Sequence, residues 1–445
     1  MPTGSPASRY GCPVTVGLVT DKYELTMVSA ALRDGTADRS ATFEVFTRRL
    51  PQGRRFGVVA GTGRLLEALG EFVFDDPALH SVRPFLDPAT LAYLSDFRFR
   101  GDIDGYAEGE LFFPGSPILS ITGTFAECVL LETLTLSILN HDSAIASAAA
   151  RMVSAAGDRT LIEMGSRRTH EQAAVAAARA AYIAGFTGTS NLEAHRRYGI
   201  PALGTSAHAF TMLHTTAHHS VGESERAAFR AQVDALGVTT TLLVDTYDVT
   251  AGVANAIEVA GTELGAVRID SGDLGVLARQ VRAQLDRLGA TETAIVVSGD
   301  LDEFSIAALR ADPVDSYGVG TSVVTGSGAP TASMVYKLVE VDGIPVQKRS
   351  SRKESQGGRK AAIRLSRPTG VAVEELIHPI STPPTPAEPF RQLMIPLVRG
   401  GRAVADSDVA TARELVATGL QSLPWEGLAL SNGEPAIPTR RVPSP

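Results

Sequence analysis

The 445-residue sequence predicts an α/β protein with an irregular parallel α/β barrel and a separate lobe of mixed α and β structure. In residues 160–321, short β-rich runs and amphipathic helical runs alternate about seven times. Strands that alternate with helices form parallel sheets, and units of roughly 20 to 40 residues in this number suit a barrel. Residues 14–121 show a mixed pattern instead, which indicates the second lobe.

The first lobe begins with two clear elements. Residues 20–35 (TDKYELTMVSAALRDG) predict a capped amphipathic helix that ends at a glycine, and residues 42–51 (TFEVFTRRLP) predict a strand. Residues 126–150 carry the longest apolar helical pattern of the chain. Charged and polar residues within it exclude a membrane span and favour a buried core helix: Glu127, Glu132, His141 and Asp142.

Composition limits the possible partners and the compartment. The net charge of −8 gives no basic surplus for nucleic acid or anionic lipid. Only two cysteines are present, Cys12 and Cys128, so a disulfide scaffold or a cysteine-ligated metal is not expected. The sequence has no signal-peptide pattern and no run of about 18 apolar residues. We therefore expect a cytoplasmic protein that contacts neither membrane nor nucleic acid.

Polar and small residues follow nearly every predicted strand of the barrel. Because the carboxyl ends of parallel strands meet at one rim, where active sites of such barrels form, these residues should converge on one site. Seven strands are expected, namely TLIEM, GFTGTS, IPALGTSAHAF, TTTLLVDT, GAVRID, TAIVVSG and DSYGVG. The residues at their ends are Arg167, Arg168, Thr189, Ser190, Ser206, His208, Asp245, Arg268, Asp270, Gly299, Asp300, Gly320 and Thr321.

The expected ligand of this rim is a phosphorylated sugar. The corners at Gly299-Asp300 and Gly320-Thr321 let backbone N–H groups approach an oxyanion, although tight turns explain either corner alone. Arg268 and Asp270 share one face of their strand, so the guanidinium can hold phosphate while the carboxylate accepts from ribose hydroxyls. Asp270, with Asp273, can also hold a Mg²⁺ shell. The alternative for Arg268 and Asp270 is a structural ion pair.

His208 is the histidine best placed for chemistry, because it is expected at a strand end among small residues. An imidazole there can serve as acid, base, ligand or nucleophile, and a purely structural histidine is the alternative. His214, His218 and His219 lie in LHTTAHHS without cysteine or carboxylate partners at metal-ligand spacing. They predict a solvated loop, and no metal site is expected from a protein motif alone.

The motifs occur in an order that resembles one enzyme family. TDKYELTM, FEVFTRRLP, LLETLTLSILN, IEMGSRRTHE, GTSNLEA, GTSAHAF, LVDTYD, VRIDSGDLG, SGDLDE and YGVGTSVVTGSG follow one another between residues 20 and 360. This order resembles bacterial nicotinate phosphoribosyltransferases, which are type II phosphoribosyltransferases. The resemblance implies transfer of phosphoribose from phosphoribosyl pyrophosphate to nicotinic acid in NAD biosynthesis, giving nicotinate mononucleotide and pyrophosphate. It also implies ATP as co-substrate and Mg²⁺ as cofactor.

The resemblance further implies an irregular α/β barrel beside a domain assembled from both chain ends, in a homodimer with shared active sites. The expected division is a disordered leader (1–12), an N-terminal α+β domain (13–125), the barrel (126–340) and a C-terminal segment (341–445) that completes the non-barrel domain.

Individual roles follow from the same resemblance. Gly299, Asp300, Gly320 and Thr321 would hold the 5-phosphate, with Arg268 and Asp270 at the ribose and pyrophosphate. His208 resembles a phospho-acceptor histidine that ATP phosphorylates, so the catalytic candidates are His208, Asp270 and Arg268. The substrate-binding candidates outside the phosphate corners are Tyr23, which would stack on the pyridine ring from the other subunit, Arg167, Ser190, Ser206 and Asp245.

Two further positions bear on substrate choice and closure. Related nicotinamide enzymes carry an aspartate where Ser190 stands here, and an aspartate would repel the carboxylate of nicotinate while a serine can donate to it. Residues 345–360 form a basic, glycine-containing stretch whose Lys348 and Lys353 could close over phosphates; a solvated charged hairpin is the alternative. Two other functions stay open, a quinolinate phosphoribosyltransferase that needs no ATP and a non-catalytic barrel that binds phosphorylated sugars.

Overall fold

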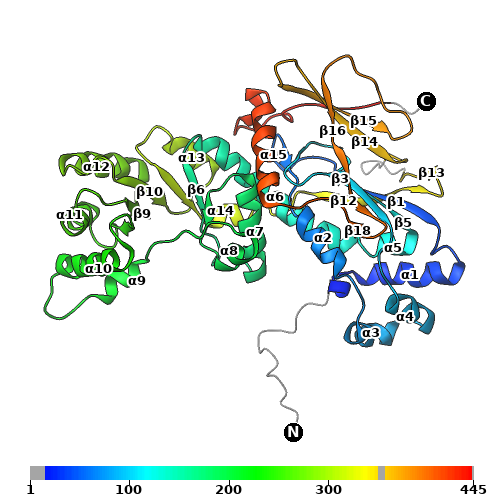
Figure 1. Cartoon of the computed structure of the whole chain (residues 1–445), viewed down its shortest axis with the longest axis horizontal. Coiled ribbons are helices and arrows are strands. Elements are labelled where there is room, and N and C mark those ends of the chain that lie inside the picture. The colour runs from blue at the N-terminus through cyan, green and yellow to red at the C-terminus, as the bar shows by residue number, and fades with distance from the viewer. Residues whose placement is uncertain (1–15, 349–355, 443–445) are drawn as a thin grey trace, which may run out of the picture.

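The computed structural model describes residues 16–348 and 356–442. A parallel half-barrel lies on one side of the long helix α6 (Glu132–Ala156), and the mixed sheets lie on the other (Figure 1). The expected leader at residues 1–12 and Lys353 lie outside the described residues.

Six parallel strands form the half-barrel in the order β7-β6-β11-β10-β9-β8. β7 and β8 are the outer strands, and no named strand in the described ranges closes the gap between them. The parallel α/β architecture is thus confirmed, with a curled sheet that stays open. The strands are β6 (Thr160–Glu163), β7 (Gly188–Thr189), β8 (Thr241–Leu243), β9 (Ala266–Ile269), β10 (Ala294–Ser298) and β11 (Ser316–Val319).

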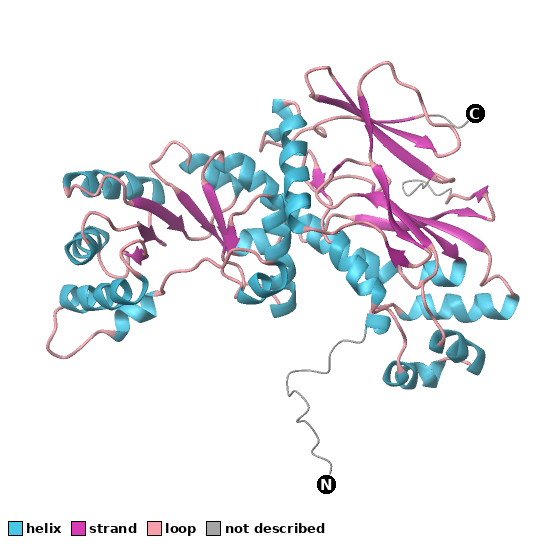
Figure 2. Cartoon of the chain, in the orientation of Figure 1, coloured by secondary structure: helices cyan, strands magenta, loops and turns pink. Residues whose placement is uncertain are grey.

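Helices follow these strands and cover the sheet (Figure 2). Side chains cap several N-termini, as Asp248 does for α11 and Asp273 for α12, because the first N–H groups of a helix lack partners within it. The helices are α7 (Glu171–Ala184), α8 (Leu192–Tyr198), α9 (His208–Leu213), α10 (Val221–Leu236), α11 (Val249–Ala260), α12 (Leu274–Arg287), α13 (Glu303–Leu309) and α14 (Thr321–Val324).

The third predicted strand, at residues 200–210, is wrong. Only a single bridge between Ala202 and Thr189 remains, and His208 begins a helix instead. Pro201 has no N–H to donate, and on the side away from β7 no strand of the described chain offers a ladder. A run that alternates like a strand therefore stays a loop.

A seven-stranded sheet draws on both ends of the chain. Its order is β13-β12-β1-β5-β3-β17-β18, and β1 lies between β12 and β5 in antiparallel pairing. The expected boundary at residue 340 falls inside β12, which belongs to this sheet. The strands are β1 (Ser40–Thr47), β3 (Asp102–Tyr106), β5 (Leu119–Thr124), β12 (Met334–Val341), β13 (Ile344–Pro345), β17 (Met394–Arg399) and β18 (Arg402–Ala403).

Two smaller sheets complete this side of the molecule. The larger has the order β16-β14-β15-β19, and the other pairs β2 with β4. Their strands are β2 (Gly57–Val58), β4 (Leu111–Phe112), β14 (Lys360–Ser366), β15 (Ala372–Pro379), β16 (Phe390–Gln392) and β19 (Thr439–Arg441). The helices nearby are α2 (Thr62–Gly70), α3 (Asp76–Val82), α4 (Pro88–Ser95) and α15 (Val409–Ser422), with short 3-10 turns at Val16–Leu18, Arg83–Phe85 and Trp425–Leu428.

The predicted first helix and first strand are confirmed. α1 (Lys22–Asp34) ends at Gly35, whose φ of 79° is the left-handed conformation that glycine adopts readily. The predicted apolar helix is also present, divided into α5 (Phe125–Val129) and α6. Buried alanines on α6 allow α7 to pack closely against it. Across the described chain, no helix combines the length and hydropathy needed to span a bilayer.

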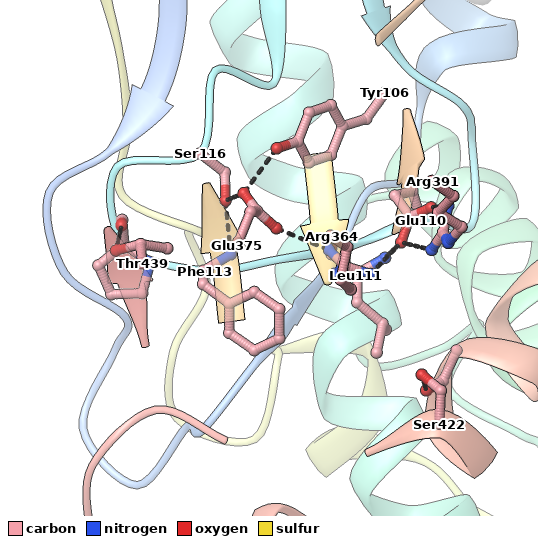
Figure 3. Close-up of polar contacts among 12 residues, drawn as sticks. Tyr106, Glu110, Leu111, Phe113, Ser116, Arg364, Glu375, Arg391, Ser422 and Thr439 are labelled. Carbon is pink, nitrogen blue, oxygen red and sulfur yellow. Dashed lines mark hydrogen bonds and ion pairs between the residues drawn. The ribbon is translucent and has the colours of Figure 1, made fainter. Parts of the chain in front are cut away.

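A buried charge network joins the β14–β15 hairpin to the segment between β3 and β5 (Figure 3). Arg364 donates to Glu110 (2.5 Å) and to Glu375 (2.8 Å), and Glu375 also accepts from Tyr106 (2.6 Å). Arg391 donates to the second oxygen of Glu110. Burial raises the pKa of Glu110, but the two guanidinium groups outweigh burial and hold that pKa below its ordinary value. The network ties the C-terminal hairpin to strands from the first third of the chain.

We expect Glu375→Gln to lower the free energy of unfolding by about 3 kcal/mol, because it leaves a buried guanidinium short of countercharge. Urea unfolding measures the loss. Glu374→Gln is the matched control on the same strand, since Glu374 pairs with the exposed Arg440 and the change should cost less than about 1 kcal/mol. Equal losses in the two variants would contradict the stabilising role of the buried network.

Candidate active site

An open hollow lies at the carboxyl ends of β6, β9, β10 and β11. Parallel pairing brings these ends together, since Ser298 of β10 is opposite Gly318 of β11 and Val297 is opposite Ile269 of β9. Eight of the thirteen residues expected at the rim line this hollow, and Thr189, Ser190, Ser206, His208 and Asp245 do not. The lining residues are Met164, Arg167, Arg168, Arg268, Asp270, Ser298, Gly299, Asp300, Gly318, Gly320 and Thr321.

Arg268, Asp270 and Ser298 form a hydrogen-bonded triangle in the wall of the hollow. Arg268 donates from Nη2 to Asp270 Oδ1 (2.6 Å) and from Nε to Ser298 Oγ (2.8 Å), and Ser298 donates to Asp270 Oδ1. Burial raises the pKa of the Asp270 carboxyl, but the bonds from Ser298 and Arg268 outweigh it and lower the pKa overall. Asp270 is therefore ionised at neutral pH and able to accept hydroxyl protons or bind a cation.

The two glycine corners lie side by side at the ends of β10 and β11. Gly299 has φ 117° and Asp300 has φ 48°, so the chain turns sharply as it leaves the sheet. A Cβ at Gly299 would collide with the Asp270 carbonyl, which explains glycine at this position. Gly320 immediately precedes α14, whose first residue is Thr321. The corners thus line the hollow with small residues, beside which backbone N–H groups can approach an oxyanion closely.

His208 lies near the carboxylate of this triangle. Its Nε2 is 4.0 Å from Asp270 Oδ2, and its Nδ1 is 3.2 Å from Thr246 Oγ1. Asp245 lies behind them, and its Oδ2 accepts from the Asp270 backbone N–H (2.9 Å) and from the Ser271 hydroxyl (2.7 Å). The other oxygen of Asp245 is buried without a hydrogen-bond partner. His208, Asp245 and Asp270 therefore form one polar group beside the hollow.

The loops that carry Arg167 and Ser190 leave adjacent strands. Glu163 of β6 pairs with Thr189 of β7, and Asn191 donates to Ser166 (3.0 Å). Arg167 is exposed and lines the hollow, whereas Ser190 is exposed on the neighbouring loop and is not among the lining residues.

Other candidates lie apart from the hollow. Ser206 donates to Gln232 of α10 (2.8 Å), and Asp273 accepts from Val276 as the cap of α12. Tyr23 belongs to α1, on the far side of α6 from the half-barrel in Figure 1. Lys348 is exposed at the end of the first described range, beyond β13. Within the described residues, no group of three or more His, Cys, Asp or Glu is arranged to hold a metal.

Three site residues were missed from sequence. Ser298 ends β10 just before the glycine corner, and only the structure shows that its hydroxyl lies between Arg268 and Asp270. Thr246 follows Asp245, and only the fold brings it to His208. Glu163 is buried at the end of β6, where it accepts from Thr189 (2.5 Å) and from the Gly165 N–H. Its burial raises its pKa, a feature that no sequence pattern reveals.

Comparison with known proteins identifies the family. Residues 18–140 match the model of the nicotinate phosphoribosyltransferase N-terminal domain, and residues 160–370 match the nicotinate phosphoribosyltransferase family model. A Mycobacterium tuberculosis protein named nicotinate phosphoribosyltransferase pncB1 is 74% identical over 428 residues, 96% of each chain. The chain belongs to the nicotinate phosphoribosyltransferase family. A Bacillus subtilis nicotinate phosphoribosyltransferase is 38% identical over 374 residues, covering 79% of this chain and 73% of that protein.

Solved structures of this kind share the fold. The human nicotinic acid phosphoribosyltransferase has a TM-score of 0.80 at 28% identity, covering 93% of this chain and 96% of that one. A nicotinate-nucleotide pyrophosphorylase from Pyrococcus furiosus has a TM-score of 0.77 at 25% identity, covering 94% and 98%. The half-barrel with its companion sheets is therefore the architecture of nicotinate phosphoribosyltransferases.

We expect Gly299→Ala to weaken anion binding in the hollow, because the added methyl must displace the Asp270 backbone. Inorganic phosphate should raise the thermal unfolding midpoint of the unmodified chain. In the variant, the phosphate concentration needed for the same rise should be at least about fivefold higher. Gly289→Ala is the control, because φ is 80° there but the nearest atom is 3.6 Å away. It should cost about 1 kcal/mol of stability without changing the phosphate response. Equal phosphate responses in both variants would exclude the corner from anion binding.

Proposed function

We propose that this chain is a nicotinate phosphoribosyltransferase that uses ATP. In the proposed reaction, the pyridine nitrogen of nicotinic acid attacks the anomeric carbon of phosphoribosyl pyrophosphate as the bond to pyrophosphate breaks. The products are nicotinate mononucleotide and pyrophosphate, a step in NAD biosynthesis, with ATP hydrolysed to ADP and phosphate. The attacking nitrogen is unprotonated near neutral pH, so positioning and electrostatics carry the step without a protein base.

One observation supports this proposal above the others. Two glycine corners, the Arg268–Asp270–Ser298 triangle and a flanking arginine surround a single hollow in a chain of this family. The corners suit the 5-phosphate through their backbone N–H groups, and Thr321 adds a hydroxyl. The guanidinium of Arg268 suits the pyrophosphate, and the ionised Asp270 suits the ribose hydroxyls.

His208 is the proposed acceptor of the ATP phosphoryl group. Thr246 lies at hydrogen-bond distance from Nδ1, which leaves Nε2 on the side of Asp270, a residue that lines the hollow. In the proposed step, Nε2 attacks the γ-phosphorus, ADP leaves, and water later breaks the P–N bond to release phosphate. A phosphohistidine here adds negative charge that Mg²⁺ and the arginines of the hollow can balance while phosphoribosyl pyrophosphate is bound.

The carboxylates around His208 fit a magnesium ion held mainly by substrate phosphates. Asp245 has a buried oxygen without a partner, and Asp270 has an oxygen beyond its bond to Arg268, so both offer the hard oxygen ligands that Mg²⁺ prefers. Asp273 already caps α12, which makes it the weaker candidate. When bound, the ion supplies positive charge to the departing pyrophosphate.

The loops of Arg167 and Ser190 are proposed to recognise the pyridine acid. Hydrogen bonding between Asn191 and Ser166 ties the loops together, so a cation and a hydroxyl donor stand on neighbouring strand ends. A carboxylate at this point gains both an opposite charge and a donor, whereas a carboxamide gains only the donor. We therefore propose nicotinate over nicotinamide as the substrate.

A second copy of the chain is proposed to complete the site. Tyr23 is about half exposed (46%) on α1, a helix on the other side of α6 from the half-barrel in Figure 1. Partial burial and the neighbouring Glu132 raise the pKa of its phenol, so the ring stays neutral and suited to stacking. In a homodimer with shared sites, Tyr23 would cover the pyridine ring of the other subunit. Lys348 and Lys353 are also proposed to contact the phosphates.

The first test is turnover with nicotinate, phosphoribosyl pyrophosphate, Mg²⁺ and ATP, monitoring the mononucleotide. We expect His208→Ala to lose ATP hydrolysis to below about 1% of the unmodified rate while weak ATP-independent transfer remains. His214→Ala is the control, because His214 caps the same short helix and its ring lies against Phe210, with Nδ1 2.9 Å from the Phe210 carbonyl oxygen. Acid-labile phosphate labelling that persists in His208→Ala would overturn the assignment. Full activity without ATP would favour a quinolinate-type enzyme instead.

Subunit mixing tests the shared site. Tyr23→Ala and Arg268→Ala should each be inactive alone, because each homodimer then lacks one component in both sites. Mixed dimers contain one site with both components intact, so up to about a quarter of full activity should return if subunits exchange at random. No recovery in mixtures shown by mass spectrometry to contain heterodimers would mean that Tyr23 does not act across subunits.

A further inference from the structure

Outside the hollow, one buried carboxylate lies between two arginines. Glu303, the first residue of α13, is 2% exposed, and its partners Arg54 and Arg151 are 7% and 4% exposed. Arg54 comes from the loop between β1 and β2, and Arg151 comes from α6. The carboxylate therefore joins the half-barrel to the other side of the molecule.

The hydrogen bonds of this cluster end on Glu303 or on backbone carbonyls of loops. Glu303 Oε1 accepts from Arg54 Nη1 (2.9 Å) and from Arg151 Nε (3.1 Å), and Oε2 accepts from the Ser327 hydroxyl. Arg54 also donates to the Gly326 carbonyl (2.7 Å), and Arg151 donates to the Gly53 carbonyl (2.6 Å). A single acidic side chain is thus bonded to three separate segments.

One of those bonds, from the Ser327 hydroxyl to Glu303, connects the segments that follow the two phosphate corners. Glu303 stands three residues after Asp300, which lies in the first corner. Ser327 follows the short helix α14, which Thr321 of the second corner begins. Asp300 and Ser327 both have positive φ, 48° and 50°, a backbone conformation that is uncommon in residues other than glycine. The bond between Glu303 and Ser327 links the far ends of both corners.

The charge of Glu303 holds this arrangement. Burial raises the pKa of its carboxyl, but the Ser327 hydroxyl, the backbone N–H of Glu303 and the two guanidinium groups outweigh burial and lower the pKa overall. The guanidinium groups of Arg54 and Arg151 share this one carboxylate. Without its negative charge, both cations would stay buried with only backbone carbonyl groups as partners. The neighbouring backbone must then shift, and the corners shift with it.

We propose that Glu303 is a positioning residue for phosphoribosyl transfer. Through Ser327, Arg54 and Arg151, its carboxylate sets the spacing between the Gly299-Asp300 and Gly320-Thr321 corners, and so the affinity for the 5-phosphate. This inference rests on the proposed function, because it takes the ligand of the two corners to be phosphoribosyl pyrophosphate. Glu303 itself does not line the hollow.

Calorimetric titration of the full-length protein with phosphoribosyl pyrophosphate tests the proposal, together with KM for each substrate and the unfolding midpoint. Glu303→Gln should raise the Kd for phosphoribosyl pyrophosphate at least about tenfold, while KM for nicotinate, measured with the other substrate saturating, stays within about twofold. Ser327→Ala removes one bond only and should raise the same Kd about threefold. In the double variant the increases should not multiply, because Ser327 acts through Glu303.

Glu375→Gln is the matched control, since it also removes a buried carboxylate charge but lies in the network of Figure 3. It should lower the unfolding midpoint comparably without changing the Kd. If Glu303→Gln lowers the midpoint yet binds phosphoribosyl pyrophosphate like the unmodified chain, or if both KM values rise equally, the carboxylate is only structural. If Glu303→Gln does not fold, the Kd of Ser327→Ala for phosphoribosyl pyrophosphate tests the proposal instead. Failure of the unmodified chain to bind this ligand would instead overturn the proposed function itself, and this inference with it.

Discussion

Parallel pairing of β6, β9, β10 and β11 is the constraint on which the site depends. Because all four strands run in one direction, their carboxyl ends lie at one edge, and the residue after each strand faces the same hollow. Arg268 lies in β9, and Asp270, two positions later, directly follows that strand. Both form hydrogen bonds with Ser298 of the adjacent strand β10. A change in register of one residue would turn these side chains away from each other.

Buried charges connect this half-barrel to the rest of the molecule. Glu108 accepts from two backbone N–H groups at the start of α2 and from both terminal nitrogens of Arg179 on α7 (2.6 and 2.8 Å). Glu303 makes the corresponding connection at the phosphate corners. Buried ion pairs cost desolvation energy and often add little net stability, so their value lies in selecting one relative placement of the segments they join. An enzyme whose ligand spans several loops benefits from that placement more than from extra stability.

Local sequence signals predicted much of the fold and part of the site. The helix that ends at Gly35, the long alanine-rich α6 and six of the seven expected parallel strands have strong periodicity, caps or glycine stops, and these signals act within a few residues. The strand expected at residues 200–210 was wrong: Pro201 has no N–H to donate, and the run lies beyond the outer strand β7, so only the bridge between Ala202 and Thr189 forms. The pairing of His208 with Thr246 was not predictable, because the two residues are 38 positions apart and only chain folding joins them.

The sequence by itself determined which chemical groups stand at strand ends: glycines that permit tight corners, arginines for anions, carboxylates and an imidazole. These features can be predicted because they depend only on the backbone freedom and side-chain chemistry of each residue and its sequence neighbours. Only the tertiary structure decided that Ser298 bridges Arg268 and Asp270, that Asp245 keeps a buried oxygen without a partner, and that Glu303 meets an arginine 249 positions earlier in the chain. Such contacts depend on the curl of the sheet and the packing of α6 against α13, and long-range packing leaves no periodic trace in the residues that it joins.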